Sequence, residues 1–136
     1  MKDIDYIRKE VLKIKRKLDC INIRTGLFNV CTSPTNTEYP HIEFRGNEYH
    51  FVETYKGSEI HRQKTTDVKE LIFWLVEPDI FELACTWELK HRAKYKDPRR
   101  AMFAKQTEYM EQACPEYVDR LKLLHKNLLN KKPFNK

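Results

Sequence analysis

The sequence predicts an α+β fold in which an N-terminal helix and a small antiparallel β-meander pack against a C-terminal bundle of about four helices. Three observations predict this fold. Apolar residues recur every three or four positions near the N-terminus, alternate with polar residues over 41–65, and return to helical spacing over 66–130. A chain of 136 residues can bury one core. We therefore expect a single domain over residues 1–136, with 1–40 forming the helix and a connection and 131–136 forming a tail.

The first helix is predicted over about residues 3–19, because five aliphatic side chains form one stripe at helical spacing. Lysines and arginines fill its other faces, as is typical of a solvated helix surface. The stripe consists of Ile4, Ile7, Val11, Ile14 and Leu18. The segment LFNVC, residues 27–31, predicts one short strand before a turn-rich connection.

The meander is predicted from two dipeptides, Gly46-Asn47 and Gly57-Ser58, which are both typical of two-residue hairpin turns. The first turn places Arg45 opposite Glu48, Phe44 opposite Tyr49 and Ile42 opposite Phe51. The second places Tyr55 opposite Ile60 and Glu53 opposite Arg62. One sheet face would then be apolar and pack on helices, with a half-buried ion pair between Glu53 and Arg62. Its apolar members would be Ile42, Phe44, Tyr49, Phe51, Tyr55 and Ile60.

Three histidines, His41, His50 and His61, are predicted on the opposite face of the sheet. In this register His50 faces Glu43 and His61 faces Thr54, so His50 and His61 lie roughly 13 Å apart at about 3.4 Å per strand residue. That separation is too large for shared coordination of a metal ion. We expect a polar sheet face and no metal site.

The C-terminal half predicts four helices with distinct start signals. Asp67 caps the first, with Glu70 at the capping-box position. Pro78 is expected to end it, and Asp79 to cap the second helix, whose stripe is Ile80, Ala84, Trp87, His91 and Tyr95. Asp97-Pro98 begins the third. Pro115 begins the fourth, with inward residues Tyr117, Val118, Leu121, Leu124 and Leu128.

The stretch HRAKYKDPRR, residues 91–100, is the junction between the second and third helices and holds six basic side chains, counting His91. Cations in a last helical turn complement the helix dipole, whereas Arg99 and Arg100 in a first turn oppose it. Arg99 also shares an apolar helical face with Gln106, so both should be paired with buried acceptors such as Glu88 or Glu53. We therefore expect a structural polar network of Glu53, Arg62, Glu88, Arg99, Arg100 and Gln106.

The net charge of +6 is unevenly distributed along the chain. Residues 1–24 carry +4, residues 25–95 carry −3 and residues 96–136 carry +5. Such a pattern suits an anionic partner and suits self-packing equally well. The four cysteines, Cys20, Cys31, Cys85 and Cys114, have no metal-ligand spacing. With no apolar leader and no membrane-length apolar run, we expect a soluble cytoplasmic protein with reduced, mostly buried thiols and no cofactor.

Several segments in a fixed order carry a resemblance to a known family: a strand glutamate, an arginine in the next strand, TTDVKELIFWLVEPDIFELACTWELKHR, DPRRAMFAKQ, PEYVDR and KKPF. This order, over about residues 48–134, resembles the immunity protein 63 family of bacterial polymorphic toxin systems. The matching positions are Glu53, Arg62, Asp67, Glu70, Leu71, Trp74, Glu88, Arg92, Asp97, Arg99, Arg100, Phe103, Gln106, Pro115, Arg120, Pro133 and Phe134. Tyr117 departs from the tryptophan expected at its position. The resemblance implies an α+β cytoplasmic protein that binds and neutralises a cognate toxin and has no enzyme activity.

Three classes of function are therefore compared. For a toxin-binding protein, the charged strand and loop positions Glu43, His50, Glu59 and His61 would form a polar rim, with Tyr39 or Tyr49 as anchors. Arg120 and His125 have the spacing of the arginine–histidine pair in all-helical HEPN ribonucleases, but the predicted meander does not fit that fold. A nucleic-acid-binding module could use the basic ends, although no phosphate loop or reading motif accompanies them. We favour the toxin-binding hypothesis, with nucleic acid an unlikely partner.

Overall fold

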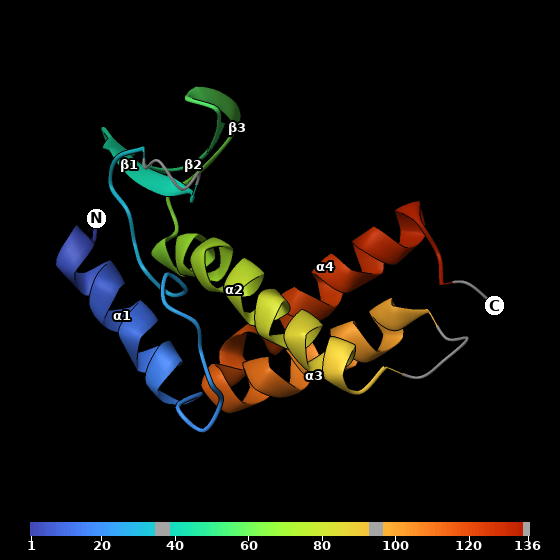
Figure 1. Ribbon diagram of the computed structural model, residues 1–136. Coiled ribbons are helices and arrows are strands. Elements are labelled where there is room, and N and C mark those ends of the chain that lie inside the picture. The colour runs from blue at the N-terminus through green and yellow to red at the C-terminus, as the bar shows by residue number, and fades with distance from the viewer. Residues whose placement is uncertain (35–38, 93–96, 135–136) are drawn as a thin grey trace. The chain divides into compact units, whose positions relative to one another are not determined.

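The fold is α+β, as the sequence predicts (Figure 1). The computed structural model describes residues 1–34, 39–92 and 97–134. Helix α1 spans Ile4–Arg16 and is followed by strands β1 (His41–Arg45), β2 (Glu48–Tyr55) and β3 (Ser58–Thr65). The C-terminal helices are α2 (Val68–Lys90), α3 (Pro98–Ala113) and α4 (Val118–Lys131), with the 3₁₀ turn η1 (Pro115–Tyr117) before α4.

Two compact units make up the chain. Unit 1 contains Met1–Lys13 and Gly26–Val76, and therefore the sheet; unit 2 contains Ile14–Thr25 and Glu77–Lys136, and therefore α3 and α4. Helices α1 and α2 each contribute residues to both units. That residues 1–136 form one domain stays a prediction.

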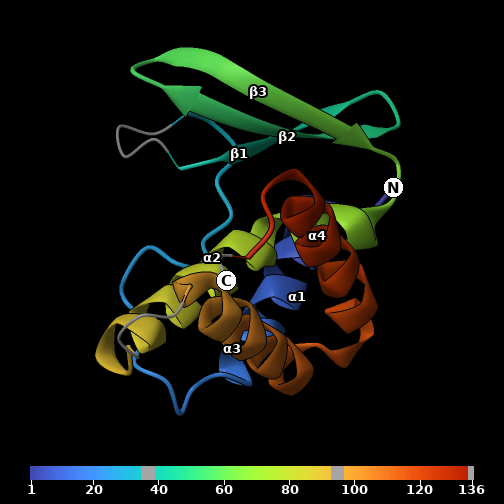
Figure 2. The ribbon, with the colours of Figure 1, turned by 90° about the vertical axis from the view of Figure 1, so that its right-hand side faces the viewer.

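The sheet of unit 1 is an antiparallel meander in the order β1-β2-β3 (Figure 2). The first hairpin has the predicted register, with Ile42 opposite Phe51, Phe44 opposite Tyr49 and Arg45 opposite Glu48. Gly46 adopts a positive φ of 62°, which a glycine tolerates without a steric penalty. The Gly-Asn turn therefore set this register correctly.

The predicted register of the second hairpin is wrong. Lys56 and Gly57 form the turn, with φ of 51° and 81°, so that Tyr55 pairs with Ser58 instead of Ile60. An irregularity between Glu53 and Thr54 leaves Ile60 as an extra residue on β3, and beyond it Val52 pairs with Arg62. Because side chains alternate along a strand, the shift moves Arg62 to the opposite sheet face from Glu53. The predicted Glu53–Arg62 ion pair is therefore absent.

The same shift separates the three histidines. His41 and His50 share one face and are buried, with 2% and 6% of their surface exposed. His61 instead pairs with Glu53, not with Thr54, lies on the other face and is exposed. The prediction that all three histidines share a solvated face is wrong, because the extra residue Ile60 on β3 reverses the faces of the residues that follow it.

Only the inner part of the predicted apolar sheet face is buried. Ile42, Tyr49 and Phe51 each have 2% or less of their surface exposed. Within unit 1, the Tyr49 hydroxyl bonds the backbone of Lys2, and Phe51 packs edge-to-face on Trp74 of α2 at 6.2 Å between ring centroids. The outer residues Phe44, Tyr55 and Ile60 are 39%, 52% and 63% exposed. The expectation that these three pack on helices is wrong.

Helix α1 forms where its apolar stripe predicts it but ends at Arg16, about three residues early; Ile7, Val11 and Ile14 are buried, as is Leu18 beyond its end. The Asp3 carboxylate accepts a hydrogen bond from the Tyr6 N–H at 3.0 Å and so caps the first turn. The predicted strand over 27–31 is wrong, since only Cys31 makes a β-bridge, to His41. Leu27 and Phe28 form turns instead, with Phe28 at a φ of 61°.

Pro78 does not break the helix, so the predicted second helix and its Asp79 cap are wrong. Helix α2 runs through Pro78 from Val68 to Lys90 and is buried on both sides of it, at Val76 and at Ile80. Pro78 itself is on the exposed side, where water can replace the backbone hydrogen bond that proline removes. At the start of α2, Asp67 caps as predicted by accepting from the Lys69 N–H at 2.9 Å.

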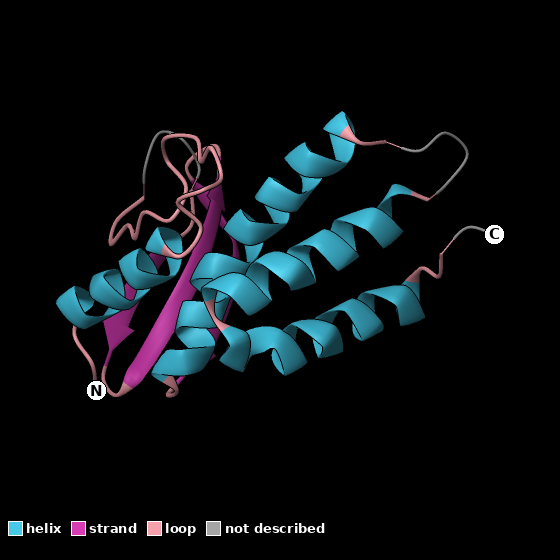
Figure 3. Cartoon of the chain, turned by 90° about the horizontal axis from the view of Figure 1, so that it is seen from below, coloured by secondary structure: helices cyan, strands magenta, loops and turns pink. Residues whose placement is uncertain are grey.

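Helix α3 begins as predicted, with Asp97 as N-cap and Pro98 in the first turn. Helix α4 follows η1, which begins at the predicted Pro115. In unit 2 the second half of α2, α3 and α4 lie side by side (Figure 3). The inward side of α4 is centred on Leu121 and His125, whereas Leu128 is 43% exposed, which corrects its predicted inward position. Tyr95, predicted on the stripe of the separate helix after Pro78, lies outside the described residues.

Candidate functional site

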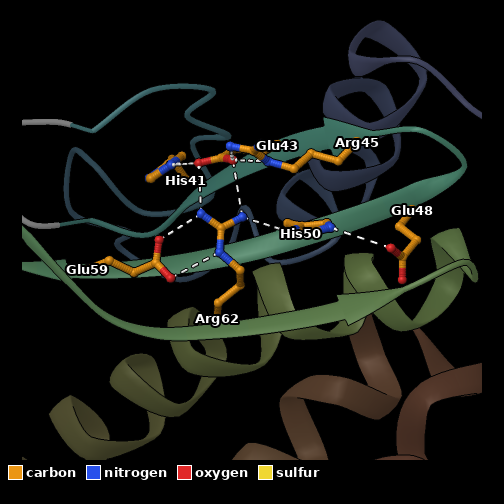
Figure 4. A network of polar contacts seen from close by, with 7 residues as sticks. All are labelled: His41, Glu43, Arg45, Glu48, His50, Glu59 and Arg62. Carbon is orange, nitrogen blue, oxygen red and sulfur yellow. Dashed lines mark hydrogen bonds and ion pairs between the residues drawn. The ribbon is translucent and has the colours of Figure 1, made fainter.

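A network of polar and charged side chains in unit 1 lies on one face of the sheet (Figure 4). Strand alternation places His41, Glu43 and Arg45 of β1 on this face, and the pairing with β2 and β3 adds the remaining members. We call this group the Arg62 cluster; it consists of His41, Glu43, Arg45, Glu48, His50, Glu59 and Arg62.

Arg62 is the centre of the cluster. Its guanidinium donates two hydrogen bonds to the Glu59 carboxylate, of 3.0 Å from Nε and 2.7 Å from NH2. The same group donates to Glu43 Oε1 at 3.1 Å and to His50 Nδ1 at 2.7 Å. A planar fork of five donors suits such a two-sided arrangement, because it can bind one carboxylate with two parallel bonds and still reach a second acceptor.

Glu43 joins the arginines to the histidine on β1. It accepts hydrogen bonds from Arg62, from His41 Nε2 at 2.9 Å and from Arg45 Nε at 2.8 Å. These bonds, that from Arg62 most strongly, lower the pKa of Glu43 from its ordinary 4.5 to about 2. The Arg62 hydrogen bonds also lower the pKa of Glu59. Both carboxylates therefore stay ionised throughout the neutral pH range.

The guanidinium determines the state of His50. A guanidinium only donates hydrogen bonds, so His50 must accept at Nδ1 and carry its proton on Nε2. That Nε2 is buried without a hydrogen-bond partner, and the nearest carboxylate oxygen, from Glu48, is 3.8 Å away. The cluster therefore contains a histidine that accepts a hydrogen bond from an arginine.

The predicted toxin-binding residues are only partly brought together. Glu43, His50 and Glu59 meet at Arg62, but His50 is buried and supports the guanidinium from within. His61 lies on the opposite face, and half-buried Tyr39 precedes β1 by two residues. Tyr49, considered as an alternative anchor, is 2% exposed and bonded to Lys2, so it is a core residue. Sequence reasoning missed Arg45 and His41, although their alternation with Glu43 along one strand was a usable signal.

The predicted structural polar network is divided into separate contacts. Glu88 is buried but pairs with Arg92, one helical turn later, at 2.8 Å. Arg99 binds its own N-cap, Asp97, at 2.9 Å and donates to the carbonyl oxygens of Lys132 and Pro133 at 2.6 and 2.7 Å. Glu88 and Glu53 are thus not the acceptors of Arg99. The ion-pair partners of Glu88 and Arg99 each lie only two to four residues away in the sequence.

Arg100 and Gln106 have other partners as well. The Arg100 guanidinium lies 4.2 Å from the ring centroid of Phe134, a cation–π contact with the closing KKPF segment. Gln106 donates to the Glu77 carboxylate at 2.8 Å, and its carbonyl oxygen accepts from His125 Nε2 at 2.7 Å. Burial raises the pKa of Glu77 and lowers that of His125 to about 4. His125 is therefore a neutral donor at pH 7.

The arginine–histidine pair of the ribonuclease alternative is not arranged for phosphate chemistry. His125 stacks on Phe103 at 4.1 Å between ring centroids and donates a hydrogen bond from Nε2 to the Gln106 carbonyl oxygen. Arg120 is half-buried and its charge acts on Glu77 of α2. The fold also contains a sheet, whereas HEPN domains are all-helical.

Other features bear on the class of protein. Within residues 1–34, 39–92 and 97–134, no group of three His, Cys, Asp or Glu side chains could hold a metal ion. In the same ranges, no helix has both the length and the apolar character needed to cross a membrane. All four cysteines are free, but none is buried: Cys20 is exposed and the others are half-buried, so the predicted burial of the thiols is wrong.

Comparison with known proteins decides the family. Residues 46–127 match the family model described as Immunity protein 63. The chain belongs to the Immunity protein 63 family. The match begins at the first hairpin turn, extends into α4 and confirms the resemblance seen in the sequence. Searches of curated proteins and of solved structures found no match. Membership of this family indicates a toxin-neutralising, non-enzymatic role.

Proposed function

We propose that this member of the Immunity protein 63 family acts in the bacterial cytoplasm, where it binds the cognate toxin domain of a polymorphic toxin system and neutralises it without catalysis. The family match over residues 46–127 is the observation that carries the proposal. The polar side chains support it, because Arg62, Glu43, Glu59 and the neutral His125 are each engaged by neighbouring side chains. Side chains that are already held by hydrogen bonds present a fixed pattern, which suits recognition of a partner protein.

The rim of the Arg62 cluster is the toxin-contacting surface in this proposal. Arg45 and Glu59 have side chains that are 63% and 46% exposed, and Glu43 and Arg62 are about one-fifth exposed. The hydrogen bonds of Arg62 already fix these side chains, so that less rotamer freedom is lost when a partner binds. Tyr39, two residues before β1, would add an aromatic contact of the kind common in binding hot spots. The surface presents both signs of charge, which favours a partner with a complementary pattern.

The test is co-expression with the toxin domain encoded beside this gene, with host survival and recovery of a complex as readouts. Wild-type protein should rescue growth and co-purify with the toxin. Glu59→Lys should weaken the complex at least tenfold, because it reverses a charge on the proposed surface. Glu111→Lys makes the same charge change at an exposed position of α3 and should bind normally. His61→Ala, on the opposite face of the sheet, should also bind normally.

Failure of wild-type rescue together with failure to form a complex would reject toxin binding for that pair. Rescue that survives Glu59→Lys but is lost in His61→Ala would keep the function and move the contact surface to the other face. Steeply salt-dependent binding of nucleic acid, without toxin binding, would instead support the basic-module hypothesis.

A further inference from the structure

Unit 2 contains a cavity of about 580 Å³ that the proposed toxin surface does not use. We call it the Phe103 pocket. Its walls are apolar: Phe81 comes from α2, Met102 and Phe103 from α3, and Leu124 and Leu128 from α4. An engineered apolar cavity of about 150 Å³ accommodates benzene, and sites for small organic ligands span about 300–1,000 Å³. The Phe103 pocket is therefore large enough for a whole small molecule and too large for one inserted aromatic side chain to fill.

The exposed wall of the pocket is almost wholly apolar, and the polar residues of its lining fall into two groups. One end contains Glu77, Gln106 and His125, which bond one another. The other end contains Arg99, Lys131 and Lys132. Lys131, the last residue of α4, and Lys132, its C-cap, follow His125 by six and seven residues, which corresponds to roughly 10 Å at about 1.5 Å per helical residue. A ligand in this pocket would therefore lie between a basic end and an end with a carboxyl group.

The basic end is held in place by Arg99. Its guanidinium binds Asp97 and the carbonyl oxygens of Lys132 and Pro133, so its own donors are engaged by the protein. These bonds fix the backbone of Lys132 at the pocket mouth. In the part of the chain that the structure describes, neither lysine side chain has an ion-pair partner, and both residues are exposed. The two ammonium groups are thus available for an anion.

The opposite end is unsuited to an anion. Glu77 already takes its hydrogen bond from Gln106, and a second negative charge there would be repelled. Because His125 donates from Nε2 to Gln106, its Nδ1 is an acceptor for a hydrogen bond from a ligand hydroxyl or amide group. The charge distribution therefore orients a ligand, with its anionic head towards the lysines and its body along the aromatic and aliphatic walls.

We propose that the Phe103 pocket binds a small amphipathic carboxylate, with the carboxylate at Lys131 and Lys132 and the apolar body against Phe81, Phe103 and Leu124. This site is separate from the toxin-contacting surface, and its existence does not depend on the toxin. The dimensions favour a medium-chain fatty acid or an aryl-alkyl acid as the class of ligand.

Calorimetric titration of the full chain with decanoate, below its micelle concentration, tests the proposal. Decanoate should bind with one-to-one stoichiometry, and decyltrimethylammonium, which has the same tail but the opposite charge, should bind at least tenfold more weakly. Equal binding of the two probes, or no binding of decanoate, would overturn the proposal.

Two pairs of variants locate the site. Leu128→Trp fills the pocket from a position that is 43% exposed, and should lower decanoate affinity at least tenfold; Leu123→Trp, on the same helix at 52% exposure and outside the lining, should not. Lys131→Glu with Lys132→Glu should likewise weaken binding tenfold, whereas Lys126→Glu should leave it unchanged. Circular dichroism establishes that each variant is folded. Binding that is equally affected by the members of a pair would show adsorption elsewhere and refute the assignment.

Discussion

Replacing Arg62 by methionine removes the charge at the centre of the cluster and retains an apolar stem that can cover Val52, the residue opposite it on β2. Three acceptors lose their donor at once: Glu59, Glu43 and His50 Nδ1. The substitution should therefore lower the free energy of unfolding at pH 7 without changing the fold.

The expected loss of unfolding free energy is estimated from the contacts of Arg62 with Glu43 and His50. A pKa of about 2 in place of 4.5 corresponds to an upper limit of about 3 kcal/mol, at about 1.36 kcal/mol per pH unit. The Glu43 side chain is 23% exposed and keeps His41 and Arg45, so solvent screening and these partners reduce the part lost with Arg62 to about 1 kcal/mol. An unpaired buried acceptor on His50 adds about 1 kcal/mol. We expect a total of about 2 kcal/mol.

Urea unfolding of wild-type protein and Arg62→Met across a pH series measures this difference and its origin. The pKa of Glu43 is depressed in the folded protein, so its stabilisation is complete above 4.5 and is lost as the pH falls towards about 2. The difference between the two proteins should accordingly be constant from pH 7 to about 5 and shrink between pH 4 and pH 2.5.

Two further variants separate this register from the one that the sequence pattern favoured. Glu43→Gln should destabilise by about 1 kcal/mol and show coupling to Arg62→Met in a double-mutant cycle. Glu53→Gln should change stability by less than about 0.5 kcal/mol, because Glu53 lies on the other sheet face. A loss below about 0.5 kcal/mol for Arg62→Met, a pH-independent loss, or coupling to Glu53 in place of Glu43 would refute the reasoning.

Three other substitutions test the turn, a helix cap and a buried histidine. Lys56→Asn should raise the free energy of unfolding by about 0.5–1 kcal/mol in urea titrations, since Lys56 has a φ of 51° and Asn-Gly is the favoured pair for this turn; a loss of stability would contradict the Lys56-Gly57 turn. Asp97→Ala should lower the calorimetric melting temperature, with a loss of about 1–2 kcal/mol, because the Arg99 N–H loses its capping carboxylate; an unchanged melting temperature would exclude capping as a stabilising contact. For His125 the pKa falls from 6.5 to about 4 on folding, so its contribution is complete above 6.5 and lost as the pH falls towards 4; wild type should lose about 1–2 kcal/mol more than His125→Gln between pH 7 and pH 5, and parallel curves would contradict a buried neutral ring.

Local signals in the sequence were reliable where one residue type controls the backbone. Gly46 fixed the first hairpin, Asp67 and Asp97 began α2 and α3, and Pro115 began the turn before α4. In each case a glycine, a capping carboxylate or a proline meets a geometric need of its immediate neighbours. The fold class and the family resemblance both follow from the order of these signals along the chain.

Two predictions, the helix break at Pro78 and the second hairpin turn, were wrong because packing along a whole helix or strand outweighed the preference of one or two residues. Pro78 is a helix breaker by propensity, yet α2 continues past it because apolar side chains are buried before and after an exposed proline. The second hairpin offers two possible turns that contain Gly57, namely Lys56-Gly57 and Gly57-Ser58. The choice of Lys56-Gly57, and of Ile60 as the extra residue, depends on pairing along the whole strand. A shift of this size reverses the face of Arg62 and changes its partners.

The sequence by itself determined the α+β class, the helix starts, the first hairpin and the family, because these depend on residue types that act over a few neighbouring positions. The tertiary structure alone decided that Arg62 joins Glu43 and Glu59, that Arg99 holds the chain near Pro133, and that Gln106 links Glu77 to His125. These contacts depend on strand register and on the rotation of each helix about its axis. Both are set by the summed packing of many side chains, which no single motif encodes.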